Sequence, residues 1–204
     1  MIAIMDYGIG NLGSVKNALD YLNEPCIITS NKEEILNADK VILPGVGAFN
    51  DAMETFKSYG FVEVVNELMK KNTPILGICV GMQILFEESE EYGIHKGLGI
   101  LKGRIVKFEK EVDGIKYKIP QMGWNQIHIT KENPLLKGLD NKDVYFVHSY
   151  YLDSSYMDDV IATTDYAGKT YGCALRKGNL YACQFHPEKS GEVGLAILKN
   201  FCNL

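Results

Sequence analysis

The sequence lacks the features that mark membrane-spanning, exported and nucleic-acid-binding proteins. No apolar run approaches the roughly 20 residues that span a bilayer, and no run of Lys and Arg forms a basic stripe. Residues 1–6 have neither a basic leading segment nor a long apolar core, so they do not resemble a signal peptide. We therefore expect a cytoplasmic protein that binds neither a membrane nor a nucleic acid.

The cysteines are scattered, and none of them form a paired motif. The sequence has five cysteines, and no two of them form Cys-x-x-Cys, the spacing typical of zinc and redox sites. No group of His, Cys and carboxylate residues has metal-ligand spacing either, so we expect neither a metal nor a cofactor. An odd number of thiols without a secretory signal is typical of a reducing compartment, where thiols remain free.

What remains is the composition of an ordinary globular protein of 204 residues, with 46% hydrophobic residues and a formal net charge of −5. In the first half, short apolar strands alternate with amphipathic helical patterns. We expect strands at residues 1–5, 25–29, 41–43 and 74–78, and helices at 14–22, after a capping box that begins at Asn31, at 48–71 with a break near 58–60, and at 81–91. This alternation predicts an open, mostly parallel twisted sheet flanked by helices on both faces.

The second half favours antiparallel strands. Residues 104–108 and 115–119 flank a Val-Asp-Gly turn and are expected to form a hairpin, and Lys177-Gly178-Asn179 predicts another. Further strands are expected at 126–129, 144–147, 160–163, 171–176 and 180–185, followed by a helix at 192–201. We therefore predict a single α/β domain over residues 1–204, with an antiparallel β extension in its C-terminal half.

One motif suggests a nucleophile. Gly77-Ile78-Cys79-Val80-Gly81 stands where an apolar strand gives way to a helix. Small flanking residues allow a sharp turn that holds a nucleophile above the sheet, where the helix N-terminus favours the thiolate and the Val80 N–H can meet an oxyanion. The motif alone is equally consistent with a buried structural cysteine beside two turn glycines.

A second motif supplies a base. Gln184-Phe185-His186-Pro187-Glu188 follows an apolar strand. In an extended segment His186 and Glu188 leave on the same side, as a base and the carboxylate that orients it require, and Pro187 keeps the backbone out of a helix. Taken alone, the pattern also describes a surface histidine beside a solvated glutamate.

A third motif, Pro44-Gly45-Val46-Gly47, ends another predicted strand and could aim a backbone N–H at an oxyanion, although alone it is equally a simple turn. The three motifs together would bring a nucleophile, a base, an orienting carboxylate and anion donors to the ends of neighbouring strands. Because open α/β sheets bind ligands at the carboxyl ends of their strands, this combination indicates an enzyme active site.

These motifs resemble those of the class I, or triad, glutamine amidotransferases, over the whole length of the chain. Within that superfamily the sequence is similar to the glutaminase subunits of imidazole glycerol phosphate synthase. The similarity to that group rests on segments 6–12, 43–49, 122–125, 146–151 and 189–191. The resemblance implies a flavodoxin-like sheet and hydrolysis of glutamine to glutamate and ammonia through a cysteinyl thioester.

The resemblance also implies a role for individual residues. Cys79 would be the nucleophile, His186 the general base and acid, and Glu188 the residue that orients it. The amides of Val46 and Val80, with Gly45 and Gly47 beside the first, would form the oxyanion site. Glutamine would be bound with the help of Gln83, Ser149 and Tyr150.

The implied partner is a (β/α)₈-barrel cyclase subunit in a heterodimer. It would receive the ammonia and make imidazole glycerol phosphate and an aminoimidazole carboxamide ribonucleotide in histidine biosynthesis. Met122, Trp124 and Asn125 would lie near this interface, although Trp124 also fits a packed aromatic on a strand. Two departures are Val80, where the family more often has Leu, and Gln121, where it often has His. Nothing in the sequence assigns a role to Gln121.

Two alternatives compete with this interpretation. The chain could serve another synthase that uses the same triad, such as those for anthranilate, aminodeoxychorismate, carbamoyl phosphate or guanylate. It could also be a non-catalytic regulatory subunit, which the intact Cys79, His186 and Glu188 argue against. His148 is not a competing base, because no carboxylate stands two positions after it. We expect His148 to be structural or to line the glutamine pocket.

Overall fold

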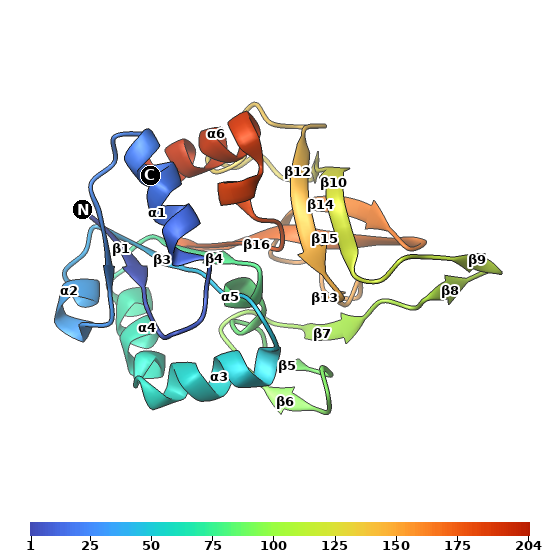
Figure 1. The fold of residues 1–204 in the computed structure, drawn as a ribbon, viewed down its shortest axis with the longest axis horizontal. Helices are drawn as coiled ribbons and strands as arrows, with labels where there is room; N and C mark the ends of the chain where they lie inside the picture. The colour runs from blue at the N-terminus through green and yellow to red at the C-terminus, as the bar shows by residue number, and fades with distance from the viewer.

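The computed structural model describes residues 1–204, and its centre is a twisted eight-stranded sheet (Figure 1). The strand order is β11-β14-β15-β16-β4-β3-β1-β2, and β16, β4, β3, β1 and β2 run parallel to their neighbours within that group. Their bounds are β1 Ile2–Met5, β2 Cys26–Thr29, β3 Lys40–Leu43, β4 Ile75–Ile78, β11 His128–Ile129, β14 Val160–Tyr166, β15 Lys169–Lys177 and β16 Leu180–Cys183. The predicted mostly parallel sheet with an antiparallel extension is confirmed.

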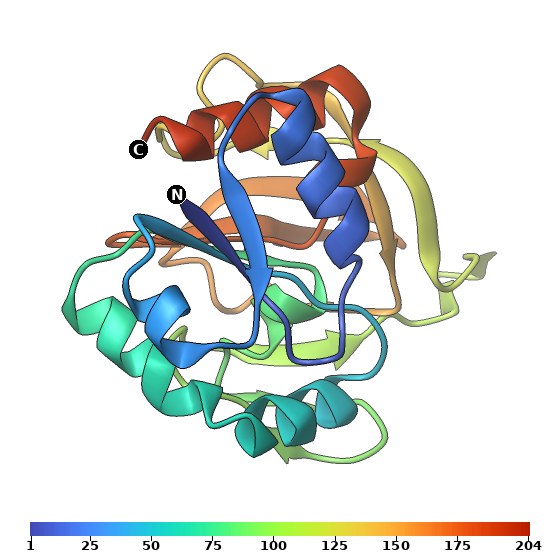
Figure 2. The same cartoon turned by 60° about the vertical axis from the view of Figure 1, so that its left-hand side comes forward.

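Helices cover both faces of this sheet. In Figures 1 and 2, α1 (Leu12–Tyr21) and α6 (Gly191–Cys202) lie on one face, while α2 (Lys32–Leu36), α3 (Phe49–Ser58) and α4 (Phe61–Lys70) lie on the other. With both faces covered, β1, β4 and β16 are buried at every position, which explains their unbroken apolar runs. None of the helices is both long and apolar enough to cross a membrane.

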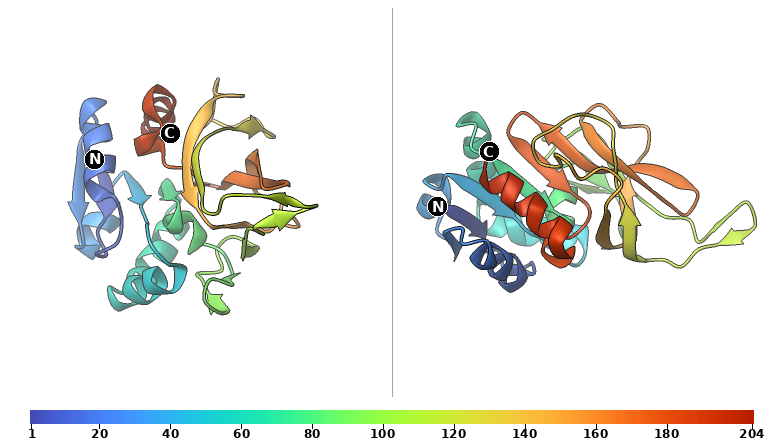
Figure 3. Two further views of the ribbon diagram at one scale, coloured as in Figure 1. Left: turned by 45° about the vertical axis from the view of Figure 1, so that its right-hand side comes forward. Right: turned by 90° about the horizontal axis from the view of Figure 1, so that it is seen from above.

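Smaller sheets stand beside the main one. β10 (Gln121–Gln126) pairs with β12 (Asp143–His148), and a second sheet has the order β13-β7-β5-β6. The strands of that second sheet are β5 Glu88–Ser89, β6 His95–Lys96, β7 Arg104–Lys107 and β13 Tyr150–Leu152. β8 (Glu111–Val112) and β9 (Ile115–Lys116) form a hairpin that projects from the body (Figures 1 and 3). β12 alternates between buried and more exposed residues, as expected of a strand with one face on the core.

The helix predicted for residues 81–91 is much too long. The observed helix, α5, covers only Val80–Gln83. The following residues are fully buried, and their carbonyls accept hydrogen bonds from another segment: Ile84 O from Leu98 N–H at 2.8 Å and Leu85 O from Ile100 N–H at 2.9 Å. Tertiary hydrogen bonds to the 98–101 segment therefore replace the helical ones, and β5 follows in place of the predicted helix end.

The hairpin predicted between residues 104–108 and 115–119 is also wrong in its pairing. The Asp-Gly turn exists, but it joins the short strands β8 and β9. β7 pairs instead with β5 and with β13, whose Tyr151 and Leu152 lie far along the sequence. At Asn31 the side chain caps α2 as predicted. The reciprocal bond of the capping box does not form, because the Asn31 N–H and the Glu34 carboxylate both bond the Thr29 hydroxyl.

The position of β16 matters most for function. Although it lies near the end of the chain, it pairs in parallel with β4, with Cys183 opposite Ile78. The residues that follow these two strands therefore emerge at the same edge of the sheet. This places Cys79, from the middle of the sequence, beside Gln184 and His186.

Candidate active site

Cys79 occupies a strained turn between β4 and α5. Its backbone has φ 55° and ψ −114°, a conformation that side-chain-bearing residues rarely adopt. The turn is possible because it packs directly against the end of β3. A Cβ on Gly81 would lie 2.0 Å from the Leu43 carbonyl oxygen, and one on Gly45 would lie 2.3 Å from the Gly81 nitrogen. The glycines of two predicted motifs thus permit one close backbone contact.

The helix after Cys79 is too short for the dipole effect expected from the sequence. α5 has four residues, so its macrodipole adds little to stabilisation of a thiolate. The turn supplies other polar groups. The Cys79 N–H donates to the Cys183 carbonyl at 2.8 Å. Val80, as the first helical residue, has no intrahelical partner for its N–H.

His186 has an extended backbone and is held in place by hydrogen bonds to β12. The His186 N–H donates to Tyr145 O at 2.9 Å. The buried Ser190 hydroxyl accepts from Tyr145 N–H at 2.9 Å and donates to His186 O at 2.6 Å. The expectation of an extended segment is correct for His186 and wrong for the next two residues, because Pro187 begins the 3-10 helix η1 (Pro187–Lys189), where its fixed φ is favourable.

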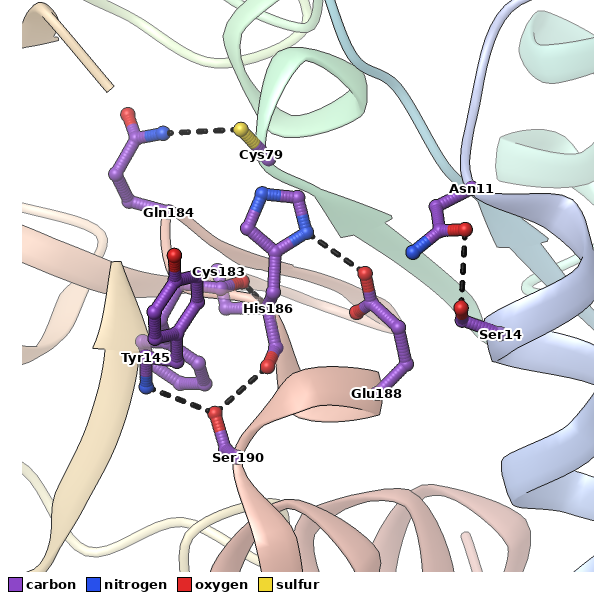
Figure 4. A network of polar contacts seen from close by, with 10 residues as sticks. Asn11, Ser14, Cys79, Tyr145, Cys183, Gln184, His186, Glu188 and Ser190 are labelled. Atoms are coloured by element: carbon purple, nitrogen blue, oxygen red, sulfur yellow. Dashed lines mark hydrogen bonds and ion pairs between the residues drawn. The ribbon is translucent and has the colours of Figure 1, made fainter. Parts of the chain in front are cut away.

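The imidazole of His186 lies between the Cys79 thiol and the Glu188 carboxylate (Figure 4). His186 Nδ1 is 2.7 Å from Glu188 Oε1, and the two side chains are only 2% and 1% exposed. Since a carboxylate accepts, Nδ1 carries the proton and Nε2 faces the thiol. Burial tends to lower the pKa of His186, but interactions with Cys79 and Glu188 outweigh it and raise this pKa to about 10. A charged imidazole is therefore favoured at this position.

Sequence reasoning assigned no role to Gln184, which lies on the other side of the sulfur. Its side-chain Nε2 is 3.7 Å from Cys79 Sγ, and its Oε1 accepts from Gln83 Nε2 at 3.0 Å (Figure 4). Gln83 Nε2 also donates to the Tyr150 carbonyl at 3.0 Å. Both glutamines are buried. The only signal in the sequence was a glutamine next to an apolar strand, and it gave no hint of these contacts.

A cavity of about 290 Å³ opens beside the thiol, close to the lower end of the size range of ligand pockets. Eight predicted residues line it: Val46, Gly47, Cys79, Val80, Gln83, Ser149, Tyr150 and His186. His148, expected to be structural or to line the glutamine pocket, lines it as well. Gly45 and Glu188 do not, because Gly45 packs against Gly81 and Glu188 lies behind the imidazole.

Two further residues support this cavity without having been assigned roles from the sequence. Glu91, its only acidic lining residue, accepts from the Phe49 N–H at 2.7 Å, and burial is the main cause of a raised pKa at this carboxyl. The buried Tyr7 hydroxyl donates to the Pro44 carbonyl at 2.7 Å. Tyr7 therefore supports the loop that carries Gly45 and Val46.

The predicted interface residues lie on β10, outside the cavity. Met122 and Trp124 are 57% and 55% exposed, and the Trp124 ring packs edge-on against Tyr145 at 6.0 Å between ring centroids. Tyr145 belongs to β12, the strand that holds the His186 backbone. No group of three His, Cys, Asp or Glu residues is arranged to hold a metal ion.

Comparison with known proteins covers almost the whole chain. The family described as "Glutamine amidotransferase class-I" matches residues 3–204. The imidazole glycerol phosphate synthase subunit HisH of Geobacillus sp. (strain WCH70) is 47% identical over 205 residues, covering 100% of this chain and 97% of the relative. The HisH subunit of Syntrophotalea carbinolica is 48% identical, with 98% of each chain covered. That of Bacillus cereus (strain G9842) is 51% identical, with 98% and 93% covered.

Solved structures share the fold at lower sequence identity. A crystal structure of a glutamine amidotransferase superposes with a TM-score of 0.74 at 18% identity, covering 100% of this chain and 99% of the other. A second glutamine amidotransferase, from Thermotoga maritima, gives 0.62 at 16% identity, covering 99% and 82%. These two support the fold alone, whereas the HisH relatives are more than twice as similar in sequence. The chain therefore belongs to the class-I glutamine amidotransferase family and, within it, to the HisH subunits of imidazole glycerol phosphate synthase.

Proposed function

We propose that this chain is the glutaminase subunit of an imidazole glycerol phosphate synthase and that Cys79, His186 and Glu188 are its catalytic triad. One observation carries the proposal: a buried imidazole lies between a thiol and a carboxylate at the edge of a cavity (Figure 4). Thiol, base and orienting carboxylate in this order make up the arrangement for nucleophilic acyl transfer. The names of the full-length relatives support the choice of synthase.

The reaction would proceed in two steps. The Cys79 thiolate attacks the side-chain carbonyl carbon of glutamine, and the proton on His186 Nε2 passes to the leaving nitrogen as the C–N bond breaks and ammonia departs. Water then attacks the glutamyl thioester while Nε2 takes its proton, which releases glutamate and restores the thiolate. Glu188 keeps Nδ1 protonated throughout.

Backbone amides and the cavity wall would serve the substrate. The Val80 N–H, free of intrahelical bonding, and the amide of Val46 are proposed to hold the oxyanion. Gln83, Ser149 and Tyr150 are proposed to bind glutamine, as the resemblance implied. We add Glu91, because it is the only acidic residue of the cavity wall and the substrate carries an α-ammonium group.

The ammonia is proposed to pass to a separate (β/α)₈-barrel cyclase subunit. There it would be used to make imidazole glycerol phosphate and an aminoimidazole carboxamide ribonucleotide. The relatives are named as subunits, which supports a partner of this kind. Met122 and Trp124 on the exposed face of β10, with the half-buried Asn125 next to them, are proposed to lie at that interface.

Replacement of the nucleophile tests this division of labour. In the complex with the cyclase, Cys79→Ala should abolish glutamine-dependent synthesis of imidazole glycerol phosphate, because no thioester can form. Synthesis from added ammonium salt should remain within about twofold, because the acceptor is bound by the partner. Cys26→Ala, which removes a half-buried thiol from β2, is the control and should keep both activities. Glutamine-dependent synthesis by the Cys79 variant would contradict the proposal.

A further inference from the structure

A continuous chain of side-chain hydrogen bonds leads from β10 to the rear of the glutamine cavity. Gln121 Nε2 bonds Asn125 Oδ1 at 3.0 Å, and Gln121 Oε1 is 2.7 Å from the Tyr171 hydroxyl. That hydroxyl is 3.0 Å from His148 Nε2, and His148 Nδ1 is 2.8 Å from the Tyr150 carbonyl. The same carbonyl accepts from Gln83, which leads on to Gln184 and the Cys79 sulfur.

The inner residues of this hydrogen-bond network are shielded from water. Gln121 and Tyr171 are fully buried and His148 is 7% exposed, so each polar atom depends on its protein partner. None of the three belongs to the proposed triad. Gln121 and Tyr171 do not line the cavity, so they can influence glutamine only through the lining residues His148, Tyr150 and Gln83.

The donors and acceptors of this hydrogen-bond network determine where its protons lie. A carbonyl oxygen can only accept, so His148 Nδ1 must carry the proton that faces Tyr150. Burial lowers the pKa of His148 to about 4, so the ring is neutral near pH 7 and Nε2 then has only a lone pair. The Tyr171 hydroxyl therefore stands between two acceptors, His148 Nε2 and Gln121 Oε1, with one proton to give.

The amide of Gln121 can resolve this conflict. Its NH₂ and oxygen ends have nearly the same shape, so the amide can turn over without new space and donate to the Tyr171 oxygen. Tyr171 can then give its proton to His148 Nε2. Asn125 is half-buried at the outer end of the chain and can turn in the same way, because its only other bond, to Asp165 O, is long at 3.4 Å.

We propose that Tyr171 is a positioning residue for the glutaminase reaction: by donating to His148 Nε2 it fixes the Nδ1–H tautomer that anchors the Tyr150 carbonyl and, through it, Gln83. Without this hydroxyl, only the Tyr150 carbonyl favours the Nδ1–H tautomer, and the Nε2–H tautomer becomes populated as well. The Nδ1 lone pair would then face the Tyr150 carbonyl oxygen. Repulsion between these two acceptors would displace Tyr150 in the cavity wall. Gln121, to which the sequence assigned no role, is then the residue whose amide turns over and donates to the Tyr171 oxygen. This inference rests on the proposed glutaminase function.

Tyr171→Phe tests the proposal kinetically. In the complex with cyclase and acceptor, the KM for glutamine should rise about five- to tenfold, the effect of one lost buried hydrogen bond on ground-state binding, with a smaller change in kcat. The control is Tyr151→Phe. Tyr151 belongs to the same aromatic cluster, with its ring centroid 5.3 Å from that of Tyr171, but its hydroxyl makes none of the hydrogen bonds of this chain. The control should change KM by less than about twofold.

Nitrogen NMR of ¹⁵N-histidine-labelled protein provides a readout that does not need turnover. Long-range ¹H–¹⁵N couplings identify the protonated ring nitrogen, so wild type and Tyr151→Phe should show His148 as Nδ1–H and Tyr171→Phe should show both tautomers. An unchanged tautomer in Tyr171→Phe, a changed tautomer with unchanged KM, or an equal rise of KM in the control would each overturn the proposal. Absence of glutaminase activity in the wild-type complex would instead reject the proposed function, and the tautomer would still be measured.

Discussion

His186 shows how one side chain balances opposing electrostatic effects. Its nearly complete burial penalises the charged ring, while the thiol on one side and the carboxylate on the other favour it. The two neighbours prevail, and the pKa of His186 rises from 6.5 to about 10. The protonated imidazole is therefore present at neutral pH, as the proposed proton transfer to the leaving nitrogen requires.

This shift predicts a pH dependence of stability. Because the folded pKa lies above the unfolded value of 6.5, the charged ring stabilises the fold fully below pH 6.5, and this contribution is lost as the pH rises toward about 10. The slope from one such group is at most about 1.4 kcal/mol per pH unit. Glu188→Gln removes one favourable neighbour, so the free energy of unfolding should fall less steeply between these pH values.

Urea unfolding at several pH values would measure this difference. Glu192→Gln, on the first turn of α6, is the control, because Glu192 is exposed and has no contact with the imidazole. It should retain the wild-type slope. An equal slope in wild type and Glu188→Gln would show that the carboxylate does not stabilise the charged ring.

At this scale, the site residues that could be predicted from the sequence are those that stand in recognisable motifs. Residues that only the fold brings together could not be predicted. Cys79 and His186 stand in short patterns whose chemistry is readable from their neighbours in sequence. Gln184 meets Gln83 across 101 positions, and Tyr171 meets Gln121 across 50. No local pattern indicates such pairs, because their importance comes from register in the sheet and from burial.

At the scale of elements, the critical junction is between β3, β4 and α5. Here two loops meet through glycines with no room for a side chain. The close contact holds the loop of Gly45 and Val46 against the turn of Cys79. A single added methyl group at this point should separate the two proposed oxyanion donors.

Gly81→Ala tests this junction. The new Cβ would lie 2.0 Å from the Leu43 carbonyl oxygen, so backbone must move. We expect a loss of stability of about 1–3 kcal/mol, the usual cost of overpacking, together with a fall in kcat of about a hundredfold or more from misplaced oxyanion donors. Thermal unfolding and glutamate release measure the two effects.

Gly13→Ala is the matched control for the same change. Gly13 lies in α1 and a Cβ there meets nothing within 4 Å. Because Ala has a higher helix propensity, this variant should be unchanged in activity and up to about 1 kcal/mol more stable. A Gly81 variant that behaves like the Gly13 variant would show that the junction can relax without consequence.

The elements themselves were predictable where local pattern and tertiary packing agree. The parallel strands were found because burial on both faces produces continuous apolar runs. The helix predicted at 81–91 was too long, because a segment that is buried on all sides has the same apolar sequence pattern whether or not its backbone hydrogen bonds are helical. The β7 pairing was missed because its partner, β13, is provided by residues far along the chain.

At the scale of the whole molecule, the exposed face of β10 is the surface best placed to meet a partner. It carries Met122 and Trp124 next to the β12 strand that holds His186. Large aromatic side chains at the centre of an interface often contribute most of the binding energy. A partner docked here would touch a strand connected to the active site by main-chain hydrogen bonds.

Trp124→Ala should therefore weaken binding of the cyclase. A loss of about 2 kcal/mol or more, or roughly thirtyfold in Kd, is expected for a central aromatic residue. Calorimetric titration measures the affinity. Ile94→Ala removes a similarly exposed side chain, 58% accessible, near β6 and should leave Kd within about twofold. Equal affinities for the Trp124 variant and wild type would place the interface elsewhere.

The late position of β16 also has a consequence for the growing polypeptide. A ribosome completes Cys79 and the strands around it long before it reaches Leu180, the first residue of β16. Until β16 inserts beside β4, one margin of the nascent sheet stays unpaired and the sulfur has no imidazole beside it. An unfinished polypeptide therefore lacks the base of the proposed triad, and we expect it to hydrolyse no glutamine before β16 is in place.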